Sequence, residues 1–268
     1  MKASAIVGAY WMRARRLTTL AALGLAAALA GCQQGHKVNY TPVDPSLRDQ
    51  PLYFYPDADR HATPRAFILF LGNDVGFWEP HQDLSWRLSH DGYTVVGVDI
   101  KRYLAELPSG EPQRDSAFAA DIGSFIARVR HEMHADSLPF IIGGHSFGAE
   151  VAFWIALHEP PPGLRGVLAM SPRASGHLFV TPEDLLNYEA SGVGAWSTIA
   201  AAHDIAPDVR IAIIRGSHDK FRKHDAAFAA AGGKRLKVYD VPLASHSLKR
   251  LIIAGPIIAR ALDFLLAK

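Results

Sequence analysis

The sequence predicts a mostly parallel, doubly wound α/β sheet, and three observations support this fold class. Continuous runs of Val, Ile, Leu and other apolar residues recur along the chain, as expected for strands buried on both faces. Segments with helical periodicity lie between these runs, which gives the alternation of a parallel sheet. About 237 residues remain after a predicted leader, enough for one α/β domain with a substantial core.

Seven apolar runs are predicted strands, and five segments between them are predicted helices. The strands are Leu52–Tyr55, Ala66–Leu71, Thr94–Asp99, Phe140–Gly143, Gly166–Met170, Arg210–Arg215 and Lys237–Val241. The helices are Glu79–Ser89, Ser116–Met133, Ala149–His158, Lys223–Ala231 and a last one from about Pro256 to Leu266. These elements place one domain in residues 52–268.

Residues 172–207 do not fit this alternation, because they contain no clear strand although they fall between two predicted strands. Their glycines and aromatic residues include Gly176, Gly192, Gly194, Phe179, Tyr188 and Trp196. Two interpretations stay open. The segment is either a small cap that covers a substrate or a packed pair of connecting helices, since long insertions are often functional but need not be.

The N-terminus is predicted to be a lipoprotein signal peptide over residues 1–31. Three arginines precede an apolar run at 17–30, which is too short for a comfortable membrane span. The run closes with Leu29-Ala30-Gly31-Cys32, which resembles the lipobox of bacterial lipoproteins. The resemblance implies cleavage before Cys32 and diacylation of its thiol. An ordinary signal peptide that ends near a cysteine is the alternative.

The same resemblance places the mature protein in the cell envelope. Gln33 follows Cys32, which favours the outer membrane, with the domain on the periplasmic face. Residues 32–51 are polar and contain three prolines, as is typical of a tether between a lipid anchor and a domain. The start codon is either Met1 or Met12, because the residues upstream of Met12 add no recognisable signal.

The charge of the mature chain argues against a nucleic-acid partner. The leader holds Lys2 and three arginines but no acidic residue, so its removal changes the formal net charge from +2 to −2. No basic run lies beyond residue 16. Cys32 is the only cysteine, which excludes a disulfide within the chain.

Ser146 lies in Gly144-His145-Ser146-Phe147-Gly148, directly between a predicted strand and a predicted helix. This order is the context of the nucleophile elbow of the α/β-hydrolase fold. The elbow strains the backbone at the serine, and the small residues Gly144 and Gly148 allow that strain. The motif therefore narrows the prediction to an α/β-hydrolase fold. A glycine-rich turn with an idle serine is the alternative.

A serine hydroxyl becomes a nucleophile when a base removes its proton, and the base needs a third group to fix its tautomer. In α/β-hydrolases the chain order is serine, acid, histidine. His246 lies just past the last predicted strand and is the predicted base. Asp219 lies in the loop after the strand that ends at Arg215 and is the predicted acid, with Asp240 as a weaker alternative.

An acyl-transfer site also needs two N–H donors for the oxyanion. One is predicted to be the backbone N–H of Phe147, directly after the nucleophile. The other is expected in the loop Gly72-Asn73-Asp74-Val75-Gly76-Phe77-Trp78, from either Asn73 or Asp74.

No metal or organic cofactor is expected. A zinc site would have to use His218, Asp219, His224 and Asp225, whose spacing matches no recognised ligand pattern. Hydrolysis through an acyl-serine needs only side chains, backbone donors and water.

From about Ala66 to His246 the chain resembles the AcvB/VirJ group of bacterial virulence proteins. The resemblance is carried by the loop Gly72–Trp78, by Val95–Tyr103, by Ser146–Val151 and by Ser171-Pro172. The family favours S-G-D-G-G-W where this chain has G-N-D-V-G-F-W, and Asp where it has Glu150. The resemblance implies a periplasmic serine hydrolase. In one branch this is an esterase acting on lysyl-phosphatidylglycerol, and in another the domain is linked to type IV secretion.

An aminoacyl ester carries an ammonium group close to the scissile carbonyl, so a carboxylate near the site would favour it. Asp74 and Glu150 are the candidates, and Trp78 is a further predicted substrate contact. Glu150 has an alternative role, because it could neutralise the dipole at the start of its own helix. The expected partners are an ester substrate, such as an aminoacyl phospholipid, and the membrane through the lipid anchor. The alternatives are a generic carboxylesterase or thioesterase and a non-catalytic, secretion-linked binding module.

Overall fold

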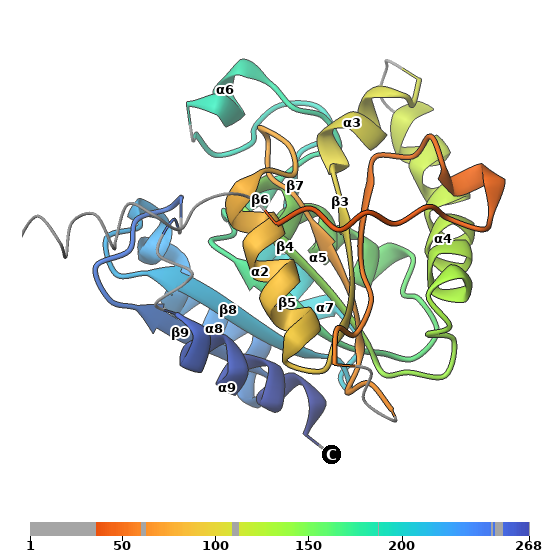
Figure 1. Cartoon of the computed structure of the whole chain (residues 1–268). Coiled ribbons are helices and arrows are strands. Elements are labelled where there is room, and N and C mark those ends of the chain that lie inside the picture. Colours follow the sequence, from red (N-terminus) through yellow and green to blue (C-terminus); the bar gives the residue numbers. More distant parts are fainter. Residues whose placement is uncertain are drawn as a thin grey trace, which may run out of the picture. The chain divides into compact units, whose positions relative to one another are not determined.

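Seven strands form one sheet in the computed structural model (Figure 1), which describes residues 36–59, 63–108, 113–186, 188–247, 249 and 254–267. The strand order is β1-β3-β2-β4-β5-β8-β9, with β1 antiparallel to β3 and every other pair parallel. The strands are β1 (Leu52–Tyr55), β2 (Phe67–Leu71), β3 (Thr94–Val98), β4 (Phe140–His145), β5 (Leu164–Met170), β8 (Arg210–Gly216) and β9 (Leu236–Val241). The predicted leader and Cys32 lie outside the described residues.

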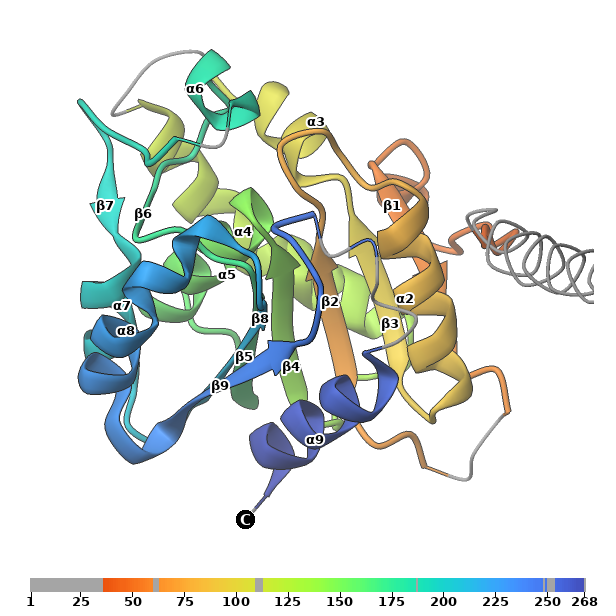
Figure 2. The ribbon, with the colours of Figure 1, turned by 90° about the vertical axis from the view of Figure 1, so that its left-hand side faces the viewer.

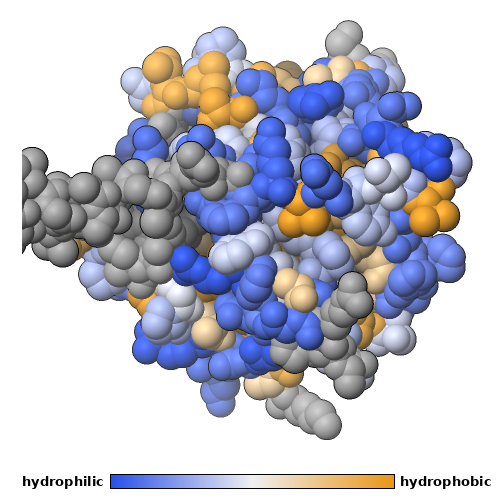
Figure 3. Space-filling model, viewed as in Figure 1, coloured by the Kyte–Doolittle hydropathy of each residue, from blue (hydrophilic) through white to orange (hydrophobic). Residues whose placement is uncertain are grey.

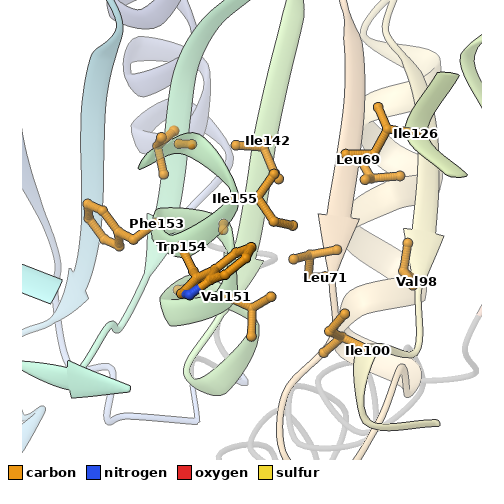
Figure 4. Close-up of a cluster of buried hydrophobic side chains, with 14 of the residues drawn as sticks. Leu69, Leu71, Val98, Ile100, Ile126, Ile142, Val151, Phe153, Trp154 and Ile155 are labelled. Atoms are coloured by element: carbon orange, nitrogen blue, oxygen red, sulfur yellow. The ribbon is translucent and has the colours of Figure 1, made fainter. Parts of the chain in front are cut away.

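Helices cover both faces of the sheet, as its continuous apolar strands require. One face packs against α2 (Glu79–His90) and α9 (Gly255–Leu266). The other packs against α4 (Gln113–Glu132), α5 (Phe147–His158), α7 (Thr198–Asp204) and α8 (Asp225–Gly232). Figure 2 shows this layering, and Figure 4 shows the second face, where Ile155 of α5 lies beside Ile142 of β4. The α/β-hydrolase fold predicted from the sequence is confirmed.

All seven predicted strands and five predicted helices are present, with ends shifted by three residues or fewer, and the fourth helix differs only in its first turn. That helix is divided into a 3₁₀ turn, η2 (Lys220–His224), and α8. The sequence analysis missed α3 (Ile100–Ala105), a short helix whose N-cap is the Asp99 side chain accepting from the Arg102 N–H. One turn capped by an aspartate is too short to show a periodic pattern.

Residues 36–51, expected to be part of a tether, pack against the domain. The Tyr40 hydroxyl donates to Glu132 Oε1 at 2.8 Å, and the N–H groups of Val43 and Asp44 each donate to the same carboxylate at 2.9 Å. Leu47, in the 3₁₀ turn η1 (Pro45–Leu47), is 1% exposed. The polar composition of the segment did not predict these contacts, because they depend on only a few residues, such as one tyrosine and one leucine.

Residues 172–207 contain both a small insertion and a helix of the main helical layer. The segment begins with a two-stranded ladder in which β6 (Ser175–Gly176) pairs with β7 (Trp196–Ser197). Between these strands the chain makes the short helix α6 (Pro182–Leu185), which stands at the upper edge of Figure 1. The segment ends in α7, which packs on α5 as part of the helical layer. We call residues 172–197 the insert.

Residues 35–268 form one compact unit, and this unit contains both core clusters. Among the described residues, each helix is too short or too polar to cross a membrane.

Candidate active site

Ser146 occupies a strained turn between β4 and α5. Its backbone angles are φ 51° and ψ −118°, outside the regions that residues with a side chain normally adopt. Gly144 and Gly148 make the turn sterically feasible: a Cβ at Gly148 would lie 2.0 Å from the carbonyl oxygen of Gly72, and one at Gly144 would lie 2.3 Å from the Gly148 carbonyl. The strain lifts Oγ away from the strand, toward the loops at the carboxyl edge of the sheet.

The structure brings Ser146, His246 and Asp219 into one hydrogen-bonded row. Ser146 Oγ lies 2.8 Å from His246 Nε2, and His246 Nδ1 lies 3.3 Å from Asp219 Oδ2. Ser146 and Asp219 are each 4% exposed, and the His246 side chain is 16% exposed. His246 comes from the loop after β9 and Asp219 from the turn after β8. The three residues predicted from chain order are therefore neighbours, although 100 residues separate Ser146 from His246.

Two further groups besides the histidine hold the Asp219 carboxylate. Its Oδ1 accepts the backbone N–H of Phe221 at 3.0 Å, and its Oδ2 lies 3.4 Å from Nη1 of the buried Arg215. Burial alone would raise the pKa of this carboxyl, but His246, Phe221 and Arg215 outweigh it and lower the pKa to about 2. Asp219 is consequently ionised at neutral pH and is oriented to accept the His246 Nδ1–H. Arg215 was not foreseen, because in the sequence it is only the last residue of a predicted strand.

Two further histidines, which the sequence analysis did not select, support the loop that carries His246. His145 Nε2 donates to the His246 carbonyl oxygen at 3.0 Å, and His145 Nδ1 accepts from His81 Nε2 at 3.0 Å. His81 Nδ1 in turn accepts the Trp78 N–H at 3.3 Å. Because a carbonyl can only accept and an N–H can only donate, these contacts fix one neutral tautomer for each ring.

Burial keeps both of these rings neutral. His145 is 4% exposed and His81 is 1% exposed. Desolvation, followed by the nearby His246, lowers the pKa of His145 to about 4, and desolvation lowers the pKa of His81 well below its usual value. We call this chain of hydrogen bonds, from Trp78 to the His246 carbonyl, the histidine relay. Although His145 is next to Ser146 in the elbow, its ring contacts the His246 backbone.

The loop after β2 contains both candidates for the second oxyanion donor, the backbone N–H groups of Asn73 and Asp74. The Asn73 N–H donates to the Gly76 carbonyl at 3.2 Å, and the Asn73 Oδ1 accepts the Val75 N–H at 3.2 Å. Asn73 therefore closes the loop on itself, while the Asp74 N–H contacts its own carboxylate, so both candidate donors already have a contact within the loop. Phe147, the other predicted donor, is the first residue of α5, where the N–H has no partner within its own helix.

Glu150 does not face a substrate, which corrects the role expected for it. The side chain is fully buried and accepts two hydrogen bonds at 2.6 Å from Nε and Nη2 of Arg173. Arg173 Nη1 also lies 2.5 Å from Asp184 Oδ1 at the end of α6. Burial lowers the pKa of Arg173, but Glu150 and Asp184 outweigh burial and raise it. Glu150 is a structural partner of the insert, because Arg173 satisfies both of its oxygens.

Asp74 and Trp78 remain near the row. Asp74 is 8% exposed, and burial raises its pKa, while the charges of Arg173 and His246 act in the opposite direction. The Trp78 indole Nε1–H is buried and has no hydrogen-bond partner within the described part of the chain. A buried donor without a partner is costly, so it is a candidate contact for a polar group of a ligand.

The remaining acids and histidines near β8 and β9 are engaged elsewhere. Asp240 pairs with Arg222 at 2.6 Å, so it does not compete with Asp219 for His246. Asp225 pairs with Arg215 at 2.9 Å and His224 with Glu189 at 2.7 Å. Within the described ranges, no group of three or more His, Cys, Asp or Glu residues is arranged to hold a metal ion.

Residues 65–170 match the model of a family described as "Bacterial virulence protein (VirJ)". The match runs from the start of β2 to the end of β5 and so includes Ser146 but neither Asp219 nor His246. It confirms the resemblance seen in the sequence over this range. No curated protein matches the chain in sequence.

Solved structures share the fold at low sequence identity. Monoglyceride lipase from Saccharomyces cerevisiae is 13% identical with a TM-score of 0.57, over 80% of this chain and 90% of that one. MenH from S. aureus is 14% identical with a TM-score of 0.57, over 81% and 98%. A carboxyl esterase from Bacillus coagulans is 13% identical with a TM-score of 0.55, over 86% and 98%. At such identities the likeness establishes the α/β-hydrolase fold, while the reaction has to be argued from the site.

Proposed function

We propose that the protein is a serine ester hydrolase that works through an acyl-serine intermediate. The observation that carries the proposal is the hydrogen-bonded row Ser146–His246–Asp219 behind a strained elbow. As His246 Nε2 takes the hydroxyl proton, Ser146 Oγ attacks the scissile carbonyl carbon and forms a tetrahedral intermediate. His246 then gives the proton to the leaving alcohol oxygen as the C–O bond breaks. Water repeats the sequence on the acyl-serine and releases the acid.

The charges that develop during this reaction have partners in the site. The ionised Asp219 stabilises the imidazolium of His246, because burial in the protein strengthens that attraction. The Phe147 N–H and the N–H of either Asn73 or Asp74 are the proposed donors to the oxyanion. Removing one such donor from a serine hydrolase typically costs about 10²–10³ in kcat.

For the substrate, we propose an aminoacyl-phosphatidylglycerol, with the lysyl ester preferred. The match to the VirJ family supports this choice, because the resemblance implies a lipid esterase in one branch of that family. The charge around the site agrees with it: Asp74, Glu150 and Asp184 face the single cation of Arg173. With Glu150 occupied by Arg173, Asp74 is the carboxylate proposed to meet the substrate ammonium. We also propose that the mature protein is anchored through Cys32 on the periplasmic face of the outer membrane.

Two alternatives make different predictions. A generic carboxylesterase or thioesterase would cleave short acyl esters and ignore the aminoacyl lipid. A non-catalytic binding module, linked to a secretion system, would not react with serine-directed reagents. The complete row of three residues supports an enzyme, because a binding module has no need to keep all of them in register.

The test is to assay the wild-type protein and Ser146→Ala side by side. We expect wild type to label with a fluorophosphonate probe and to hydrolyse lysyl-phosphatidylglycerol in liposomes, followed by thin-layer chromatography. Ser146→Ala should fold normally and lose both properties, because Oγ contributes little to packing. Labelling without loss of the lipid, together with brisk turnover of aryl esters, would indicate the generic esterase. Absence of labelling and turnover would support the binding module.

A further inference from the structure

Large apolar side chains are exposed around the candidate active site. Six of them are more than half exposed: Val75 (61%), Leu185 (53%), Leu186 (65%), Tyr188 (59%), Val193 (83%) and Leu243 (64%). We call these six residues the apolar rim. Single exposed apolar residues are common on soluble proteins, so the position of these six is what calls for an explanation.

The apolar rim comes from three loops that meet at the carboxyl edge of the sheet. Val75 follows β2, Leu243 follows β9, and the other four belong to the insert after β5. Next to Val75, the charges of Asp184 and His246 both act on the pKa of the Asp74 carboxyl, so this loop lies near the insert and near the catalytic row. Figure 3 shows hydrophobic side chains gathered over α6 at the upper left. The rim therefore surrounds the approach to Ser146.

Leu243 indicates that this exposure is not incidental. Its φ is 57°, a left-handed conformation that costs free energy in any residue with a side chain. The Leu243 N–H donates to Ser217 Oγ at 2.9 Å, so the turn after β9 is held in place. The strained turn therefore presents a leucine to solvent three residues before His246.

Cations flank the apolar rim on two sides. On η2, Lys220 and Lys223 are exposed, and Lys220 Nζ lies 5.5 Å from the centre of the Tyr188 ring. On the other side, Lys101 and Arg114 line a cleft together with Phe179 of the insert. Two acids of the insert have local partners, since Asp184 shares Arg173 with Glu150 and Glu189 lies 2.7 Å from His224. Apolar tips with an aromatic ring and a basic fringe match the boundary of an anionic bilayer.

We propose that the apolar rim is a membrane-docking surface, which seats the open side of the active site on an anionic lipid bilayer. The leucines, valines and tyrosine enter the headgroup region, and Lys220 and Lys223 contact lipid phosphates. This surface goes beyond the proposed reaction and does not need it, because docking depends on surface residues and not on Ser146.

The first test measures binding without turnover. The domain starting at Gly35 contains both core clusters and is one compact unit, so it is suitable without the leader. Carrying Ser146→Ala, it is mixed with vesicles of phosphatidylcholine alone or with added phosphatidylglycerol, and the bound fraction is measured by flotation. We expect binding to both kinds of vesicle, stronger with phosphatidylglycerol.

Variants separate the apolar and charged contributions. Leu185→Ser with Leu186→Ser should weaken binding to both vesicles by about tenfold or more, because two large side chains no longer leave water. Lys220→Glu with Lys223→Glu should weaken binding only to the anionic vesicles. Val43→Ser is the matched control, since Val43 is 80% exposed but lies in the N-terminal segment, and it should change nothing. All these positions are exposed, so folding should be unaffected.

A second readout uses the intact serine. The Leu185/Leu186 variant should keep its turnover of a soluble aryl ester and lose turnover of an ester embedded in vesicles. If the protein proves to have no esterase activity, the flotation result still decides the docking proposal. The proposal is overturned if the parent domain binds neither vesicle, or if the Leu185/Leu186 variant binds as well as the parent. Rim-dependent capture of a periplasmic protein without vesicle binding would likewise overturn it, in favour of a protein partner.

Discussion

Two fully buried arginines lie near the candidate active site, and they serve different purposes. Arg215 ends β8 and lies between Asp219 and Asp225, while Arg173 opens the insert and lies between Glu150 and Asp184. Both are about 1% exposed or less, and each has two carboxylate partners. By local chemistry the two clusters look alike.

The difference lies in what the carboxylates do next. The Asp219 carboxylate lies 3.3 Å from His246 Nδ1, and His246 contacts Ser146. The Arg215 cluster is therefore part of the chain of contacts that ends at Ser146. Glu150 accepts hydrogen bonds from Arg173. Asp184 pairs with Arg173 and accepts from the N–H and hydroxyl of Thr181 in the insert. Arg215 therefore acts on the proposed chemistry, and Arg173 fastens the insert to α5. Each of the following predictions tests that division.

The largest expected effect is on the Arg215 side. Asp219→Asn should fold but lower kcat by about 10⁴, because an amide favours the wrong imidazole tautomer. Asp240→Asn is the control, since Asp240 pairs with Arg222 on the surface and should leave turnover nearly unchanged. Steady-state assays on an aryl ester measure both. A mild effect at Asp219 with a severe one at Asp240 would transfer the acid's role to Asp240.

On the Arg173 side the expected effect is on stability. Arg173→Met should lower the free energy of unfolding by about 3–5 kcal/mol, because it leaves Glu150 buried and unpaired. The double variant with Glu150→Met should recover much of this loss, since two apolar side chains can replace a buried ion pair. Denaturant unfolding measures the three free energies.

The matched control for Arg173→Met is Arg222→Met, which breaks an exposed pair and should cost less than about 1 kcal/mol. Equal losses at Arg173 and Arg222 would contradict the role of Arg173 as a buried fastener of the insert.

The same comparison explains how far the sequence could predict the site. Ser146, His246 and Asp219 each follow a strand in a fixed order, and parallel strands bring such loops to one edge, so chain position was sufficient. Glu150 could not be assigned in this way. Its place in the first turn of α5 fits a dipole or a substrate role, and its real partner, Arg173, is set by the tertiary path of the insert.

The histidine relay was missed for a similar reason. His81 is an ordinary residue in the first turn of α2, and its contact with His145 depends on the packing of α2 against the sheet. The sequence held only a weak indication of this contact. His145 follows a buried strand, so its ring is expected to be buried and to need a hydrogen-bond partner. Nothing in the spacing of the chain identifies that partner.

The relay predicts a positioning effect of intermediate size. His145→Phe should leave the His246 carbonyl and the His81 N–H without partners, which typically costs about 1–3 kcal/mol for a buried group. We expect a lower kcat with little change in KM, because the loop carrying His246 loses its support while substrate contacts stay. His145→Gln can still accept from His81 and donate to the carbonyl, so it should recover activity. Equal loss in both variants would show that the ring itself, and not its hydrogen bonds, is required.

The last prediction concerns the stability of the fold in acid. At neutral pH its effect is the smallest of those expected here. The folded pKa of His145 is lowered to about 4, whereas in the unfolded chain it should be near 6.5. Between these values the unfolded chain binds more protons than the folded one, so stability should fall as the pH falls from about 6.5 to about 4. His81 acts in the same direction, because its folded pKa is also lowered. Asp219, with a folded pKa of about 2, should add a second loss below about pH 4, as the unfolded carboxyl takes up its proton first.

Denaturant unfolding of the Ser146→Ala protein across this pH range measures both losses. His145→Gln should flatten the loss between pH 6.5 and 4 and leave the loss below pH 4. Asp219→Asn should do the reverse, because it removes the carboxyl and keeps the relay. If His145→Gln did not change the loss between pH 6.5 and 4, and Asp219→Asn did not change the loss below pH 4, the acid sensitivity would have to arise outside the Ser146–His246–Asp219 row and the histidine relay. The Arg173 cluster would then be the next place to examine, since its carboxylates also need to stay ionised for the insert to remain attached.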